Sequence, residues 1–312
     1  MGMVMADADR AVSGWQAQAW LELSRRVDGQ GGGSTVHQGG ATAPLKWQRS
    51  FPQPDGRLEV PLLHTAGGLV GGDALAVRLA LGAGASGLIT SVAAQKVYGS
   101  VGRSRLAPTG QWSSQHLQVT LAEGADLEWL PQELVLYRGG LFEQRTRVQL
   151  APGASWLGAE VVRLGRTADG EVLDLGAWRS SLEIRRLNDW EFVDRLSLDG
   201  HSLASLHGLA QQPVVGSLVW AAPQAVPATL IDEARRAATD LPGEMACGLL
   251  ERGLVARYRG PSTQAARFWF CRLWALIRAH RGLPAPVLPR VWPFQEDPFS
   301  AAAPCPEAEG SA

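Results

Sequence analysis

The first segment whose residues could bind a ligand or take part in a reaction is a glycine-rich stretch at residues 64–75, HTAGGLVGGDAL. It places one aspartate after four glycines. Gly67 and Gly72 have the spacing of the two glycines in a nucleotide-binding P-loop, where a Lys and a Ser or Thr follow to meet the phosphate and its magnesium ion. Asp73 and Ala74 stand in those two positions here, and an aspartate would repel a phosphate. We therefore expect a structural motif of turns and close backbone approaches rather than a nucleotide site. Its glycines are Gly67, Gly68, Gly71 and Gly72.

Three side chains at residues 91–98 are candidates for catalysis. Lys96 and Tyr98 lie two residues apart, so a strand would place them on one face, where they could act as base and acid. Ser91 is a candidate nucleophile, but no histidine is near it in the sequence and the chain has no Gly-x-Ser-x-Gly elbow. The pattern favours a structural role for Lys96 and Tyr98. An enzyme, either a hydrolase or a reductase, that uses Lys96, Tyr98 or Ser91 is the alternative.

Isolated carboxylates are the remaining candidates for chemistry. If several of them meet at a cavity, they would hold a divalent cation weakly, as transport requires; the alternative for each is a solvated acid on a turn. The three cysteines and six histidines show neither a Cys-x-x-Cys nor a His-x-x-x-His spacing, so the sequence does not contain a prebuilt metal site. The acids singled out by their position are Asp73, Glu128, Glu133, Glu160 and Glu171.

Composition narrows the class of protein that must position these residues. With 312 residues, of which 46% are hydrophobic and 19% charged, the chain is long enough for a substantial core and typical of globular proteins. A formal net charge of −1 gives no electrostatic reason to expect a nucleic-acid partner. No apolar run approaches the roughly eighteen residues of a membrane span, and the first residues do not resemble a signal peptide. We therefore expect a cytoplasmic protein without membrane or nucleic-acid partners.

Alternation of apolar and polar residues predicts a mainly β fold, for example at residues 74–81, 116–122, 145–150 and 178–184. The sequences LGAGAS (81–86), LAEGAD (121–126) and LAPGAS (150–155) each end such a run, which indicates one repeated strand-turn-strand device. We expect stacked, layered antiparallel strands, a glycine-rich loop at residues 28–40, and a few helices toward the C-terminus. These helices cover residues 229–243, opened by a capping box of Thr229 and Asp232, and residues 262–282.

The predicted domain organisation has three parts. Residues 1–14 form a flexible N-terminus, residues 15–293 a single β-rich domain, and residues 294–312 a disordered C-terminal tail that is rich in Pro, Ala and Glu.

A series of segments, in order along the chain, resembles the urease accessory protein UreD family, which is called UreH in some species. The segments are PLLHTAGGLVGGDAL, LITSVAAQKVYGS, LEWLPQELVLY, LGAEVVRLGRTADGE, GLVARYRGPSTQAAR, WALIRAHRGLP and PRVW. The resemblance covers roughly residues 15 to 293 and is specific as a combination. It departs from the family at residues 64–66, where a proline-rich HPPGG is usual, and at residues 93–96, where Gly-Ala-Thr-Lys or Gly-Ala-Ala-Lys is usual.

The resemblance implies a largely β, layered or helically wound architecture with a few helices. It also implies a non-enzymatic scaffold and metallochaperone without a tightly bound cofactor. Such a protein binds UreF, which recruits the GTPase UreG, and the assembly docks on apo-urease while nickel(II) reaches the carbamylated-lysine site. On this reading Asp73 faces a transient nickel conduit, and Glu133 and Glu171 are weaker candidates for it. A structural module that is indifferent to metal is a third reading, which nickel dependence would separate from the first.

Partner contacts are predicted in the later segments, where arginine and aromatic residues gather. Packing of their apolar bodies on a β-layer is an equally weighted alternative. The candidates are Arg257, Tyr258, Arg259, Arg290 and Trp292.

Overall fold

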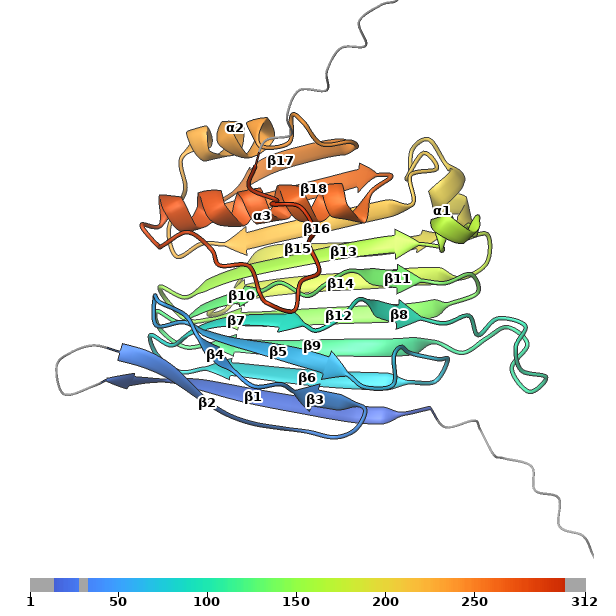
Figure 1. Ribbon diagram of the computed structural model, residues 1–312, viewed down its shortest axis with the longest axis horizontal. Helices are drawn as coiled ribbons and strands as arrows, with labels where there is room; N and C mark the ends of the chain where they lie inside the picture. Colours follow the sequence, from blue (N-terminus) through green and yellow to red (C-terminus); the bar gives the residue numbers. More distant parts are fainter. Residues whose placement is uncertain (1–13, 28–32, 301–312) are drawn as a thin grey trace, which may run out of the picture.

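Two stacked β-sheets make up most of the protein in the computed structural model, which describes residues 14–27 and 33–300 (Figure 1). In spatial order the first sheet contains β15 (Asp189–Asp199), β14 (Ala177–Arg186), β12 (Leu141–Leu150), β9 (Ser113–Leu121), β6 (Ala74–Leu81), β1 (Gln16–Val27) and β2 (Gly33–Ala41). The second contains β17 (Glu244–Leu250), β18 (Gly253–Gly260), β16 (Val214–Ala221), β13 (Ser155–Leu164), β10 (Asp126–Trp129), β7 (Ser86–Ser91), β5 (Leu58–His64) and β3 (Leu45–Trp47). Three short strands complete it: β4 (Phe51–Pro52), β8 (Gln95–Val97) and β11 (Leu134–Leu136).

The chain winds between the two sheets like a coil, so the mainly β, helically wound prediction is confirmed. Strands β1, β6, β9, β12 and β14 pair in parallel in the first sheet, as do β5, β7, β10 and β13 in the second. The expectation of antiparallel layers is wrong for this central part, because each turn of the coil contributes strands of one direction to each sheet. Antiparallel pairing is found toward the edges, as in β14 with β15 and β16 with β18.

The three related sequences at residues 81–86, 121–126 and 150–155 are the corners where the chain passes from the first sheet to the second. Gly84, Gly124 and Gly153 have φ of +63°, +63° and +69°, a region that glycine occupies without strain. The corners stack on one another, since the Gly84 amide donates to Glu123 and the Gly124 amide donates to Pro152. The repeated strand-turn-strand device predicted from the sequence is therefore confirmed.

Substitution of a corner glycine tests whether its left-handed backbone conformation requires glycine. An alanine at Gly124 meets no atom within 4 Å but must adopt φ of +63°, so we expect Gly124→Ala to lower the free energy of unfolding by about 1–2 kcal/mol. Gly248 in β17 is the matched control, because its Cβ would also meet no atom within 4 Å and its φ is not in the left-handed region. Urea denaturation compares the two; an equal effect of both substitutions would contradict the assignment.

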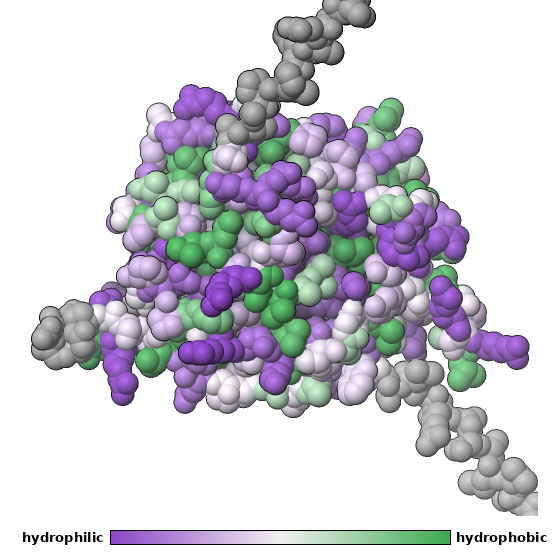
Figure 2. All heavy atoms as spheres, in the orientation of Figure 1, coloured by the Kyte–Doolittle hydropathy of each residue, from purple (hydrophilic) through white to green (hydrophobic). Residues whose placement is uncertain are grey.

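Two hydrophobic clusters hold the layers together. One lies between the sheets and includes Trp156, Trp178 and Phe142; the other packs the outer side of the second sheet against α2 (Ala228–Arg236) and α3 (Thr263–His280). The remaining helices are the short α1 (Gly200–Ala204) and the 3-10 turn η1 (Thr167–Asp169). Figure 1 shows α3 lying across the second sheet, and Figure 2 shows small apolar patches interspersed with polar side chains on this same face.

The predicted late helices are both present, but α2 ends at Arg236 rather than at the predicted residue 243. Ser262 caps α3, because its Oγ accepts a hydrogen bond from the Ala265 amide at 3.2 Å. The capping box predicted at Thr229 and Asp232 is wrong: α2 begins at Ala228 with Pro227 at the N-cap position and without a side-chain cap, which leaves Thr229 inside the helix.

Two predicted irregular segments are more ordered than their composition indicates. The second part of the glycine-rich stretch 28–40 belongs to β2, which pairs with β1, whereas residues 28–32 lie outside the described residues. Residues 294–300 of the expected tail contact α3: the Phe294 ring meets Phe268 edge-on, with ring centroids 5.3 Å apart, and Arg272 donates to the Pro298 and Ser300 carbonyls. Residues 301–312 and residues 1–13 lie outside the described residues.

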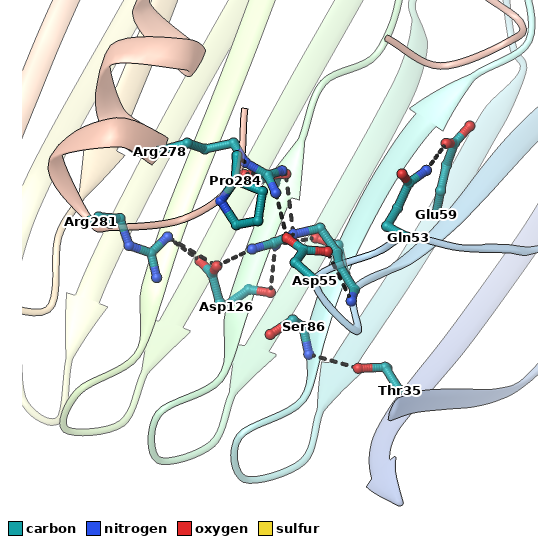
Figure 3. A network of polar contacts seen from close by, with 12 residues as sticks. Thr35, Gln53, Asp55, Glu59, Ser86, Asp126, Arg278, Arg281 and Pro284 are labelled. Atoms are coloured by element: carbon teal, nitrogen blue, oxygen red, sulfur yellow. Dashed lines mark hydrogen bonds and ion pairs between the residues drawn. The ribbon is translucent and has the colours of Figure 1, made fainter. Parts of the chain in front are cut away.

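A buried network of ion pairs fastens the end of α3 to the second sheet (Figure 3). Arg57 pairs with Asp126 and lies 3.5 Å from Glu128, and Arg278 of α3 pairs with Glu128 at 3.1 Å and with Asp55. Arg281 pairs with Asp126 at 2.9 Å at the rim. Three guanidinium groups therefore face three carboxylates. The ion pairs connect three segments that are far apart in the sequence: residues 55–57, residues 126–128 and residues 278–281.

Candidate functional site

A partly open cavity of about 210 Å³ lies between the two sheets, and polar side chains reach it from both. Gln115 and Gln144 are contributed by β9 and β12 of the first sheet, and Glu160 by β13 of the second. His64, at the end of β5, and Lys96, in β8, also line it. The titratable side chains on the wall of this cavity are thus one imidazole, one carboxyl and one ammonium group.

Glu160 is the acid of this cavity, a half-buried residue whose carboxyl group lies on the inward side. Its strand neighbours on the same face, Trp156 and Val162, belong to the core between the sheets, so the carboxyl group enters an otherwise apolar layer. The Ser180 hydroxyl donates to Oε2 at 3.3 Å, whereas Oε1 is buried and has no hydrogen-bond partner among the described residues. Burial raises the pKa of Glu160 to about 7, with the hydroxyl of Ser180 opposing the shift and the charge of Asp194 adding to it.

His64 lines the same cavity and also has unused polar atoms. Both of its ring nitrogens are buried and have no hydrogen-bond partner among the described residues. Burial lowers the pKa of His64, although the nearby charge of Asp73 opposes this, so the imidazole is neutral at neutral pH. A neutral imidazole and an ionised carboxylate are the ligand types that bind borderline divalent cations. Within residues 14–27 and 33–300, however, no three His, Cys, Asp or Glu side chains gather as a closed metal site would need.

The glycine-rich loop packs against β8 at Lys96 and Tyr98. A Cβ on Gly68 would lie 2.6 Å from the Tyr98 ring and 2.9 Å from the Lys96 carbonyl oxygen, so only glycine allows the loop to approach β8 this closely. The loop pairs with that strand, because the Leu69 amide donates to Lys96 and the Tyr98 amide donates to Leu69, both at 2.8 Å. Gly67, Gly68, Lys96 and Tyr98 are therefore brought together as parts of one local structure.

Asp73 fixes the other end of this loop. Its carboxylate accepts hydrogen bonds from the Trp15 amide at 2.7 Å and from the Val70 amide at 2.8 Å, and the residue is 2% exposed. The carboxylate thereby anchors the start of β1 to the turn before β6. Asp73 is not among the residues that line the cavity. The nickel role predicted for Asp73 stays a prediction, and the structure adds a backbone-anchoring role to it.

The two other predicted metal ligands are engaged in ion pairs at separate places. Glu133 accepts from Arg267 of α3 at 3.2 Å, near Trp292 rather than in the cavity wall. Glu171 accepts from the Arg138 amide and pairs with Arg166 at 2.7 Å. Burial would raise the pKa of Glu171, but these hydrogen bonds and the charge of Arg166 lower it instead. The structure therefore does not bring Asp73, Glu133 and Glu171 together into one group.

The residues of the enzymatic alternative are near one another but are not joined as a catalytic group. Ser91 donates to the Ala93 carbonyl at 3.2 Å and accepts from the Gln132 amide at 2.9 Å. The Tyr98 ring meets Tyr137 edge-on, with centroids 5.1 Å apart. Within the described residues no hydrogen bond links Ser91, Lys96 and Tyr98 to one another.

Most of the predicted interface residues serve contacts within the chain. Arg257 crosses between the sheets to pair with Asp194 at 2.6 Å, and Arg259 pairs with Glu244 at 2.6 Å. Tyr258 is 1% exposed and donates to the Pro242 carbonyl at 3.0 Å. The Trp292 indole donates to the Thr90 hydroxyl at 2.7 Å. Arg290 is the exposed residue of the set, so its side chain is accessible for contact with a partner protein.

The helices of the described part of the chain were compared with the requirements of a membrane span, and none is both long and apolar enough to cross a bilayer.

Comparisons with known proteins identify the family of this chain. The family described as UreD urease accessory protein matches residues 16–293. A urease accessory protein UreD of Prochlorococcus marinus (strain MIT 9303) is 56% identical over 293 residues, which are 91% of this chain and 98% of the relative. The protein of the same name in Synechococcus sp. (strain CC9605) is 57% identical over 275 residues, or 86% of this chain and 88% of the relative. The chain therefore belongs to the UreD family of urease accessory proteins.

Proposed function

We propose that this chain is a non-catalytic urease maturation factor of the cytoplasm. Together with UreF and, through UreF, the GTPase UreG, it docks on apo-urease and supports the delivery of nickel(II) to the urease active site. Membership of a urease accessory protein family supports the role in maturation. The observation that supports the nickel part is the cavity between the sheets, where His64 and Glu160 both present buried polar atoms without hydrogen-bond partners among the described residues.

Nickel in transit needs ligands that replace part of its hydration shell and then release it, as in an ion channel. A neutral imidazole and a carboxylate meet that need, and Gln115 and Gln144 add carboxamide oxygens to the same wall. We therefore place the passage at His64 and Glu160, and we keep Asp73, Glu133 and Glu171 as weaker candidates. Arg290 is the proposed contact for a partner among the residues selected from the sequence.

The test is urease activity in a heterologous host that expresses the structural subunits, UreF and UreG, with and without this chain. At equal urease protein and fixed nickel, we expect activity well above background only when the chain is present, since apo-urease would otherwise lack its metal. The nickel content of purified urease should follow the activity. Equal activity and equal nickel content without the chain, in a host without its own homologue, would remove the proposed role.

A further inference from the structure

The outer face of the first sheet, which points away from the core, carries a marked excess of positive charge. Along β6, β9, β12, β14 and residues 190–197 of β15, alternation places one set of side chains outward, and this set includes more arginines than acids. The outward arginines are Arg78, Arg145, Arg147, Arg179, Arg185 and Arg195; the outward acids of the set are Glu143 and Glu183, while Glu22 of β1 and Asp199 at the end of β15 adjoin this surface. We call this surface the arginine face.

The two acids neutralise only part of the charge. Glu183 pairs with both Arg147 and Arg195 at 3.2 Å, and Glu143 pairs with Arg145 at 2.9 Å. The side chains of Arg147 and Arg195 remain 71% and 72% exposed despite these contacts. No ion pair in the described part of the chain involves Arg78. Several guanidinium groups on this face thus keep donors directed at solvent.

A groove at one side of the arginine face could accept a side chain of a partner protein. A shallow groove of about 530 Å³ crosses β1, β6 and β9, and it is lined on its outer side by Trp20, Glu22, Arg78, Ala80, Gln118 and Thr120. Trp20 is 44% exposed, and Trp190 at the opposite edge is 51% exposed with the Arg185 guanidinium 3.7 Å from its ring centroid. Exposed Trp and Arg are the residue types that dominate binding energy at protein interfaces.

We propose that the arginine face is a docking surface for an acidic protein surface. Planar guanidinium groups on a rigid sheet match carboxylates in two-point hydrogen bonds, and the groove accepts an apolar side chain between them. Together with β1, which carries Trp20 of the groove, the five strands of the face make six strands at about 4.8 Å spacing. With three two-residue steps of about 7 Å along each strand, the surface measures roughly 24 by 20 Å, a large part of a standard interface. The proposal rests on the proposed function, since the partners to be tested are the maturation proteins named there.

Charge and shape favour a protein over a polyanion. A nucleic-acid-binding domain is strongly basic as a whole, whereas this chain has a formal net charge of −1. The pairing of Arg145, Arg147 and Arg195 with carboxylates on the same face also shows that acidic side chains fit beside these guanidinium groups.

The experiment removes three charges from the face and the same number elsewhere. The face variant carries Arg78→Ser, Arg145→Ser and Arg195→Ser. The control variant carries Arg103→Ser, Arg105→Ser and Arg236→Ser, which are exposed positions on a loop and on α2. Thermal melts first establish that both variants fold like the unaltered chain. Biolayer interferometry then measures the affinity of each full-length protein for purified UreF and for purified apo-urease, between about 50 and 300 mM salt.

We expect the face variant to bind at least one of these two proteins about tenfold or more weakly, with a shallower salt dependence, whereas the control variant binds as the unaltered chain does. Equal affinity of the face variant for both proteins would overturn the proposal while leaving the maturation role intact, provided that the unaltered chain still activates urease. Loss of binding to double-stranded DNA or to anionic vesicles, with binding to both proteins unchanged, would overturn it in favour of a polyanion or a membrane surface.

Discussion

Replacing Arg57 with methionine is expected to lower the free energy of unfolding by about 3–5 kcal/mol, the cost of removing one partner from a buried ion pair. The Arg57 side chain is 2% exposed and the Asp126 and Glu128 side chains are 6% and 2% exposed, so water cannot replace the lost guanidinium. In the variant, the carboxylates of Asp126 and Glu128 would share the remaining charges of Arg278 and Arg281 (Figure 3). Urea denaturation followed by tryptophan fluorescence gives the difference.

Arg147→Met is the matched control for this prediction. Arg147 also pairs with a glutamate, but its side chain is 71% exposed, and such surface pairs contribute about 0–1 kcal/mol. If Arg57→Met leaves too little soluble protein, Arg281→Met at the 19% exposed rim should show an intermediate loss. A loss for Arg57→Met no larger than that for Arg147→Met would contradict a stabilising role for the network.

The network also sets how the protein responds to acid. Burial would raise the pKa of Asp126, but the charges of Arg57 and Arg281 more than offset it and hold the pKa at about 2. Since this pKa is below its usual value of 3.8, the contribution of Asp126 to stability is complete above pH 4 and is lost as the pH falls toward 2. Arg57→Met should lose part of this acid dependence along with the stability.

Local patterns in the sequence predict the strands, the corners and the long helix, because each depends on neighbouring residues. The spacing of Gly84, Gly124 and Gly153 follows from the left-handed turns at the corners, and Ser262 followed by an apolar stripe predicts α3. Strand direction was missed, because alternation along β6 or β9 is the same in parallel and antiparallel pairs. The order of residues 294–300 was missed for a related reason: it depends on contacts with Arg272 and Phe268, not on composition.

The candidate site depends on contacts between distant residues, so only part of it could be predicted. Glu160 was recognised as an isolated acid, but its place on a face shared with Trp156, Val162 and Leu164 is the signal that could have marked it as buried. In the sequence, His64 stands out only as part of the glycine-rich stretch. Its ring nitrogens lack hydrogen-bond partners among the described residues because of how the two sheets pack, and residue spacing in the sequence does not predict that packing.

Glu160→Gln is expected to reduce urease activation at limiting nickel by at least about tenfold, because the amide keeps the shape of the side chain but cannot carry the charge that attracts nickel(II). Glu233→Gln is the control, because it makes the same change from carboxylate to amide at an exposed position of α2. Activity and nickel content of purified urease should both fall for the first variant and stay unchanged for the second, with equal amounts of the accessory complex recovered.

The same substitution is expected to make the protein more stable, which separates a role in nickel transfer from a role in folding. The pKa of Glu160 is about 7 in the folded protein against 4.5 normally, so its contribution to stability is complete below pH 4.5 and declines as the pH rises through 7. Glutamine does not ionise, so between pH 5 and 8 Glu160→Gln should gain up to about 3 kcal/mol of unfolding free energy relative to the unaltered chain. Greater stability at pH 8 together with lower nickel transfer would show that the buried carboxylate is retained for the metal. Lower stability at pH 8, or full urease activation, would mean that Glu160 serves the packing of the two sheets instead.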